Sequence, residues 1–196
     1  MATPTKIKDL TQGRLYTVEE FDALGLPDEL EDGSYYELVE GEVILVPPAG
    51  GEHGKIALRI LKAIILFDPS EKLGCVYYPT RFQFGGFRAA PDLFFFNASR
   101  LPNLDRGAIK VPADLAVEVW SESDWGSAAS RRIAYTKINT YLKNGFRLVW
   151  VINPKDKIVE VFHQGQSDAI KLNLGDVLEG GDVIPGFSMP VAELFS

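Results

Sequence analysis

Two carboxylates lie inside strand-like apolar runs, and they constrain the fold more than any other feature of the chain. Asp92 occurs in Ala-Pro-Asp-Leu-Phe-Phe-Phe, and Glu118 occurs in Asp-Leu-Ala-Val-Glu-Val-Trp. An ionised carboxylate in such a run loses hydration that apolar neighbours cannot replace. It therefore needs a cation, hydrogen-bond donors or a bound metal ion. Two such acids in one chain indicate a shared cation at a buried sheet.

The alternation of side chains along a strand predicts which face carries each acid. In residues 114–120, Glu118 shares a face with Ala116 and Trp120, while the intervening apolar residues project to the other face. In residues 92–96, Asp92 shares a face with the second and fourth residues that follow it. If the two strands are neighbours, the carboxylates of Asp92 and Glu118 converge.

A lysine on a later helix is the candidate cation. On a helical wheel advancing about 100° per residue, Lys137 falls between Ile133 and Tyr141, on the apolar arc of the helix predicted over residues 127–144. Arg132 and Lys143 fall on the opposite arc. A lysine on the apolar face either snorkels past its edge or meets a carboxylate.

The order of the predicted elements indicates an α/β (α+β) fold, a mixed β-sheet core flanked by helices with additional N- and C-terminal strands. Helices are predicted over residues 17–24, 53–67 and 127–144, and a strand pair with a turn at Glu40-Gly41 over residues 35–46. Further strands are predicted over residues 75–84, 92–96, 114–120, 147–152 and 158–162. Residues 97–112 read as irregular, and the tail as short strands with a final helix near residues 191–195.

Composition limits the partners and the compartment. With 196 residues, 46% of them hydrophobic, the chain is expected to form one domain over residues 1–196. The net charge of −7 argues against nonspecific coating of nucleic acid, although basic residues concentrate in the middle of the chain. A lone cysteine, Cys75, excludes an internal disulfide. The missing secretion segment predicts a cytoplasmic protein, and the apolar residues 56–67 are too few for a membrane span.

The motifs also narrow the chemistry. The chain has neither a Gly-x-Ser-x-Gly elbow nor a P-loop, which argues against serine hydrolysis and P-loop nucleotide hydrolysis. Convergent carboxylate oxygens are instead hard ligands suited to Mg²⁺ or Mn²⁺. Such an ion supports phosphodiester cleavage, and a fixed positive charge assists it.

Several short motifs occur in an order that resembles the Uma-two family of restriction endonucleases, which is abundant in cyanobacteria and belongs to the PD-(D/E)XK nuclease superfamily. The resemblance covers most of the chain. Its motifs are Tyr36-Glu37-Leu38-Val39-Glu40-Gly41-Glu42, Glu52-His53-Gly54, Pro91-Asp92-Leu93, Val117-Glu118-Val119-Trp120-Ser121, Lys137 with Tyr141 and Gly145, and Arg147-Leu148-Val149-Trp150-Val151-Ile152-Asn153-Pro154.

The resemblance implies a restriction-endonuclease-like core and a magnesium-dependent DNA endonuclease. Asp92 and Glu118 would hold the metal, and the backbone carbonyl of Val119 would add a ligand. The superfamily lysine normally follows the second acid by two residues, where this chain has Trp120. The family pattern moves the lysine to the following helix, where Lys137 fits. A homodimer or higher homo-oligomer would let two sites reach two DNA strands.

Alternative roles remain open for several of these residues. Asp92 can be a strand-start residue that accepts backbone hydrogen bonds, and Glu118 can form a structural ion pair with Lys137 or Arg131. Glu37 either joins the site or faces solvent.

Two further residues and the activity itself also have alternatives. His53 either contacts phosphate or caps its helix, and Arg132 can stand in for Lys137. At the level of function, the alternative is a catalytically inactive nuclease-fold module that binds DNA or protein. A metal-dependent phosphoesterase acting on a nucleotide or RNA is a weaker third possibility.

Overall fold

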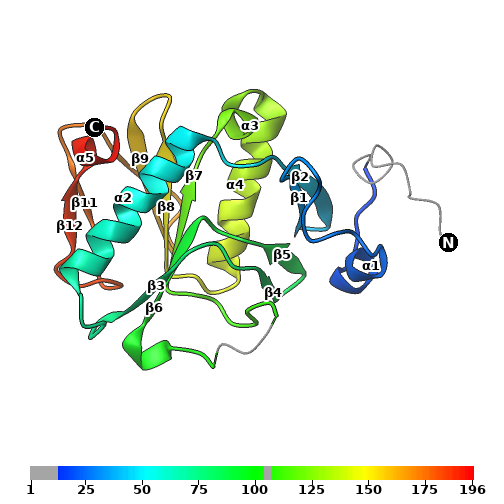
Figure 1. The fold of residues 1–196 in the computed structure, drawn as a ribbon, viewed down its shortest axis with the longest axis horizontal. Coiled ribbons are helices and arrows are strands. Elements are labelled where there is room, and N and C mark those ends of the chain that lie inside the picture. The colour runs from blue at the N-terminus through cyan, green and yellow to red at the C-terminus, as the bar shows by residue number, and fades with distance from the viewer. Residues whose placement is uncertain (1–12, 104–106) are drawn as a thin grey trace.

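A six-stranded mixed sheet forms the centre of the protein (Figure 1). The structure, a computed structural model, describes residues 13–103 and 107–196. The strand order is β10-β9-β8-β7-β6-β3, and within it only β7 and β8 are parallel neighbours. The strands are β3 (Gly74–Tyr77), β6 (Leu93–Asn97), β7 (Leu115–Val119), β8 (Leu148–Asn153), β9 (Ile158–His163) and β10 (Ile170–Leu172).

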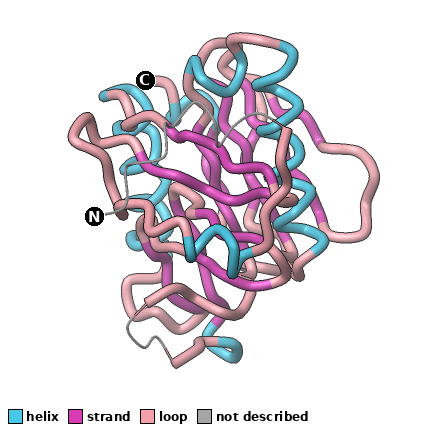
Figure 2. The backbone as a smooth tube through the Cα atoms, turned by 90° about the vertical axis from the view of Figure 1, so that its right-hand side faces the viewer, coloured by secondary structure: helices cyan, strands magenta, loops and turns pink. Residues whose placement is uncertain are grey.

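Two long helices cover opposite faces of this sheet, and the strands run through the middle of the molecule (Figure 2). Helix α2 (Gly51–Phe67) packs Ile56, Ile60 and Ile64 on one face. Helix α4 (Ala128–Lys143) packs on the other face, together with Ala116 and Trp120 of the β7 segment. The predicted alternation along residues 114–120 is therefore confirmed.

A second, four-stranded sheet has the order β2-β1-β5-β4. Its first hairpin joins β1 (Tyr35–Val39) to β2 (Glu42–Val46) through Glu40 and Gly41, which have φ values of 49° and 82°. Two successive positive φ angles match the twist of a two-residue hairpin, which explains the glycine there. Helix α1 (Val18–Ala23) covers this sheet, and a capping box between Thr17 and Glu20 begins the helix.

One predicted strand was wrong. Residues 75–84 do not form a single strand, because β3 and β4 (Phe82–Phe84) belong to different sheets. Pro79 lies between them and has no N–H to donate to a ladder, so the chain leaves the first sheet there. Strand β5 (Phe87–Ala89), which was not predicted, pairs with β4 across the turn at Gly85 and Gly86.

Two short helices in the connections were also missed. They are the 3₁₀ helix Ala98–Arg100 and α3 (Glu122–Trp125). The 3₁₀ helix lies within the stretch 97–112 predicted to be irregular, of which residues 104–106 lie outside the described residues. The N-terminal segment used for the prediction of compartment likewise falls in residues 1–12, outside the described part.

The C-terminal tail folds onto the α2 side of the central sheet. Its elements are β11 (Val177–Glu179), β12 (Ser188–Pro190) and α5 (Val191–Leu194), as the predicted short strands and final helix anticipated. Arg59 of α2 donates a 2.8 Å hydrogen bond to the carbonyl oxygen of Leu194. Within residues 13–103 and 107–196, no helix combines the length and the apolar character needed to cross a bilayer.

Candidate active site

The register of two neighbouring strands places Asp92 beside Glu118. Strand β6 runs antiparallel to β7 with Leu93 opposite Val117, and the Asp92 N–H donates a 3.0 Å hydrogen bond to the Val117 carbonyl oxygen. One residue further along the same register, Asp92 lies across from Glu118. The two acids predicted to converge therefore meet where β6 begins and β7 ends.

Glu118 is almost enclosed, with 12% of its side chain exposed, and two donors from α4 hold its carboxylate. The Lys137 Nζ lies 3.2 Å from Oε1, and the Tyr141 hydroxyl donates a 2.6 Å hydrogen bond to the same oxygen. Burial raises the pKa of Glu118 to about 8, although the positive charge of Lys137 acts to lower it. Tyr141 was predicted to pack in the core beside Lys137, but the contact of its hydroxyl with Glu118 was not predicted. Lys137 and Tyr141 are four residues apart on α4 and therefore share a helix face, which could have indicated that both reach Glu118.

Lys137 lies on the inner face of α4, as the helical wheel predicted, and joins two acids from different sheets. Its Nζ is 3.0 Å from Oε2 of Glu37 and also contacts Glu118, with 14% of the lysine side chain exposed. Burial lowers the pKa of Lys137, but the charges of Glu118 and Glu37 outweigh burial and hold that pKa well above its usual range. Lys137 is therefore a fixed positive charge.

Glu37 belongs to this cluster and does not face solvent. It lies on β1, where its side chain is buried, and its Oε1 accepts a 2.8 Å hydrogen bond from the Ala90 N–H. The contact ties the four-stranded sheet to the segment that leads into Asp92. Of the two roles left open for Glu37, the solvent-facing one is wrong.

Asp92 is held by donors from two other elements. Its Oδ2 accepts a 2.7 Å hydrogen bond from the Val119 N–H and lies 3.0 Å from Nε2 of His53, in the first turn of α2. Burial lowers the pKa of His53, but the hydrogen bond and charge of Asp92 raise it more, and the net shift is upward. His53 is therefore a partner of Asp92, a role beyond the two expected from the sequence. Asp92 also accepts a backbone hydrogen bond from Val119, as in the structural alternative named for it.

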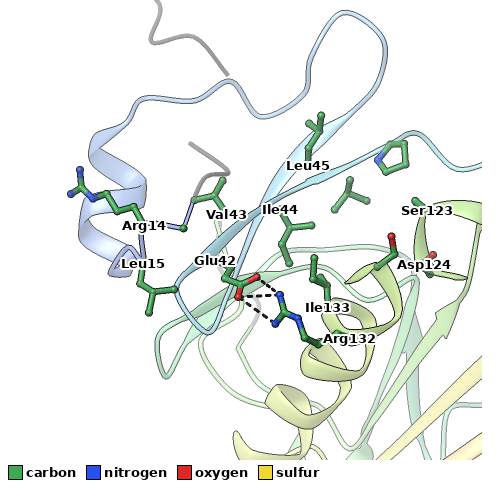
Figure 3. A pocket seen from close by; sticks show the side chains of 14 residues that line it. Arg14, Leu15, Glu42, Val43, Ile44, Leu45, Ser123, Asp124, Arg132 and Ile133 are labelled. Carbon is green, nitrogen blue, oxygen red and sulfur yellow. Dashed lines mark hydrogen bonds and ion pairs between the residues drawn. The ribbon is translucent and has the colours of Figure 1, made fainter. Parts of the chain in front are cut away.

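The two neighbouring arginines do not join this cluster. Arg131 donates to the carbonyl oxygen of Trp125, and Arg132 pairs with Glu42 on β2 at 3.2 Å (Figure 3). Lys137, rather than Arg131 or Arg132, is the cation that contacts Glu118. The assignment of Lys137 rather than Arg132 as the cation of the site stays a prediction, which this contact supports.

A cavity of about 550 Å³, which we call the central pocket, opens onto the cluster. Its lining includes Glu37, His53, Asp92, Glu118 and Lys137. Among residues 13–103 and 107–196, no group of three or more acidic, histidine or cysteine side chains is arranged to hold a metal ion. Any ion in the central pocket would thus be held by fewer side chains, supplemented by backbone oxygen, water or substrate.

The fold is similar to that of a solved protein structure. A crystal structure from Anabaena variabilis ATCC 29413, described as that of "a putative nuclease belonging to DUF820", matches with a TM-score of 0.73 and 24% sequence identity. The match covers 92% of this chain and 97% of that chain. This likeness concerns the fold, and with the mixed sheet flanked by helices it confirms the predicted fold class.

The family follows from the sequence itself. The Uma2 family model, described as "Putative restriction endonuclease", matches residues 18–192. The chain therefore belongs to the Uma2 family, which confirms the resemblance noted from its motifs. No curated protein matches the chain.

Proposed function

We propose that the protein is a magnesium-dependent DNA endonuclease that hydrolyses phosphodiester bonds. The observation that carries this proposal is the meeting of Asp92, Glu118 and Lys137 at one open pocket. Membership of the Uma2 family supports a nuclease. We also propose that the chain acts as a homodimer, because two copies can cut two strands.

The donor set suits a small hard cation. Mg²⁺ binds through one or two carboxylates and keeps several waters, so the Asp92 and Glu118 carboxylates meet its requirement without a third acid. The N–H and C=O of one strand residue point to the same side, so the Val119 carbonyl is directed with its N–H toward Asp92. These three residues would hold Mg²⁺, or Mn²⁺ with the same hard ligands. When bound, the ion would supply activation of water and charge stabilisation at the phosphate.

The remaining residues of the cluster would act on water and phosphate directly or through their neighbours. Lys137 presents a positive charge to the pocket and can orient a water or stabilise charge that develops on a phosphate oxygen. Glu37 forms a second ion pair with the Lys137 ammonium, beside that of Glu118. Tyr141 fixes one Glu118 oxygen by its hydroxyl. The site is thus organised by contacts within the protein before any substrate arrives.

Cleavage of DNA by the purified protein, offered as plasmid duplex and as an unpaired strand, with and without Mg²⁺, tests this function. We expect cleavage that depends on the metal and is lost in Asp92→Asn and Glu118→Gln, which keep the shape of each side chain. Glu179→Gln, at an exposed acid of β11, is the matched control and keeps activity. Cleavage that persists in both site variants would refute the assignment of these acids.

A noncatalytic nuclease-fold module is the second candidate. It is favoured by one observation, that protein donors already contact both acids, through His53 and Val119 for Asp92 and through Lys137 and Tyr141 for Glu118. Calorimetric titration with Mg²⁺ and Mn²⁺ separates the two functions. Binding that disappears in Asp92→Asn supports the enzyme, whereas no binding of either ion supports the module.

A further inference from the structure

The central pocket continues into a second cavity along the edge of β2. This β2 pocket has a volume of about 490 Å³ and is lined from Arg14 to Arg132 by β2, α3 and the start of α4 (Figure 3). The two cavities share the lining residues Ile44, Val46, Pro47, Ser123, Asp124 and Ile133. We call the two adjoining cavities together the groove; the acids line its central-pocket end, and Arg14 and Arg132 line its β2 end.

The reacting end of this groove is recessed. The side chains of Asp92, Glu118 and Lys137 are mostly buried, so a phosphate must enter the pocket to reach them. Duplex DNA is stiff, with a persistence length of about 150 base pairs, and it carries its phosphates on a convex surface. An unpaired strand bends freely and can place one phosphate inside a recess.

Exposed apolar side chains lie at the rim of the central pocket. Binding of a duplex backbone would instead require positive charge there. Tyr78 is 73% exposed and Leu58 is 63% exposed, and both line this pocket. Exposed aromatic rings are platforms on which unpaired bases stack. Arg81 lines the same pocket but is paired with Asp28, so its charge is already compensated within the protein.

The β2 end of the groove carries an exposed positive charge. Arg132 is 59% exposed and forms a surface pair with Glu42, which a phosphate can replace. On α4, Arg132 precedes Lys137 by five residues and lies on the opposite arc of the helix. Arg132 can therefore contact a part of a bound strand other than the phosphate beside Lys137.

We infer that the groove takes one unpaired polynucleotide strand, with a base stacked on Tyr78 and the backbone passing Arg132. This inference rests on the proposed nuclease function and names its substrate class. DNA and RNA strands share the chemistry that the groove would recognise. The strand would run from the recessed acids along β2 toward Arg132.

Fluorescence anisotropy of labelled 20-nucleotide strands in EDTA tests this inference apart from cleavage. We expect the full chain to bind unpaired DNA or RNA at least tenfold more tightly than the corresponding duplex, and the tighter of the two identifies the sugar. Tyr78→Ala should weaken binding about tenfold or more, and Tyr78→Phe, which keeps the ring, should restore it. Arg132→Ala should lower the salt slope by about one. Lys155→Ala removes an exposed charge outside both pockets and should change neither quantity.

The outcomes separate this inference from the proposed function. Duplex binding equal to or tighter than strand binding, unchanged binding in Tyr78→Ala, or no binding of any strand would overturn the inference. Metal-dependent cleavage of duplex DNA that Tyr78→Ala leaves intact would overturn the inference and keep the nuclease. Strand binding without cleavage in Mg²⁺ or Mn²⁺ would keep the inference and overturn the nuclease.

Discussion

Replacement of Lys137 by methionine tests the central ion cluster most directly. The change keeps the length of the side chain and removes the charge that lies 3.0 Å from Glu37 and 3.2 Å from Glu118. Removing one partner of a buried ion pair leaves the other charge uncompensated and costs about 3–5 kcal/mol. We expect the free energy of unfolding to fall by that amount, measured by urea denaturation in EDTA.

Lys143 provides a matched control on the same helix. It also pairs with a glutamate, Glu40, at 3.4 Å, but 69% of its side chain is exposed. Surface pairs contribute about 0–1 kcal/mol, so Lys143→Met should lower stability by less than about 1 kcal/mol. Equal losses in the two lysine variants would refute the reasoning, because burial is the main difference between the pairs.

A double-mutant cycle identifies the partner of Lys137. Glu118→Gln should cost less stability when Lys137→Met is already present, with a coupling free energy of about 0.5–3 kcal/mol. The same lysine variant should lower the rate of DNA cleavage by about 10²–10³-fold if Lys137 stabilises charge at the phosphate. Additive stability losses would show that the two side chains do not support each other.

Other side chains give further expected outcomes. Tyr141→Phe removes the hydroxyl contact to Glu118 and should cost about 1.5–3 kcal/mol in urea denaturation; no loss would contradict this contact. His53→Ala removes the side-chain partner of Asp92 and should weaken Mg²⁺ binding about 10–100-fold, measured by calorimetry. Unchanged Mg²⁺ affinity would count against a role of His53 in positioning Asp92. Gly180→Ala would place a Cβ 2.3 Å from a backbone oxygen and should cost about 1–3 kcal/mol, whereas Gly175→Ala meets nothing within 4 Å and serves as its control.

Local patterns were sufficient to predict many elements of this fold. The apolar period of residues 53–67 corresponds to α2, which begins two residues earlier at Gly51. The same kind of period predicted α4 and the inward position of Lys137. Strand alternation predicted that Glu118 shares its face with Trp120. These features repeat within a few residues, and the geometry of a helix or strand alone determines them.

Other features depended on which segments became neighbours. The buried position of Glu37 results from packing of β1 against α4, with Lys137 a hundred residues away in the chain. Tertiary packing also divides residues 75–84 between two sheets. It likewise brings His53 to Asp92, which is 39 residues away in the chain. A local pattern specifies the face of each strand but not which strand lies beside it.

The sequence alone thus determined the two long helices and two of the short ones, most strands, the family, and the two acids and lysine proposed for the site. The tertiary structure decided how these charges are compensated, with Glu37 and Glu118 both paired with Lys137 and His53 in contact with Asp92. The physical reason is distance. Electrostatic and hydrogen-bond contacts act over a few ångströms, and only the packing of the sheets and helices brings these residues that close.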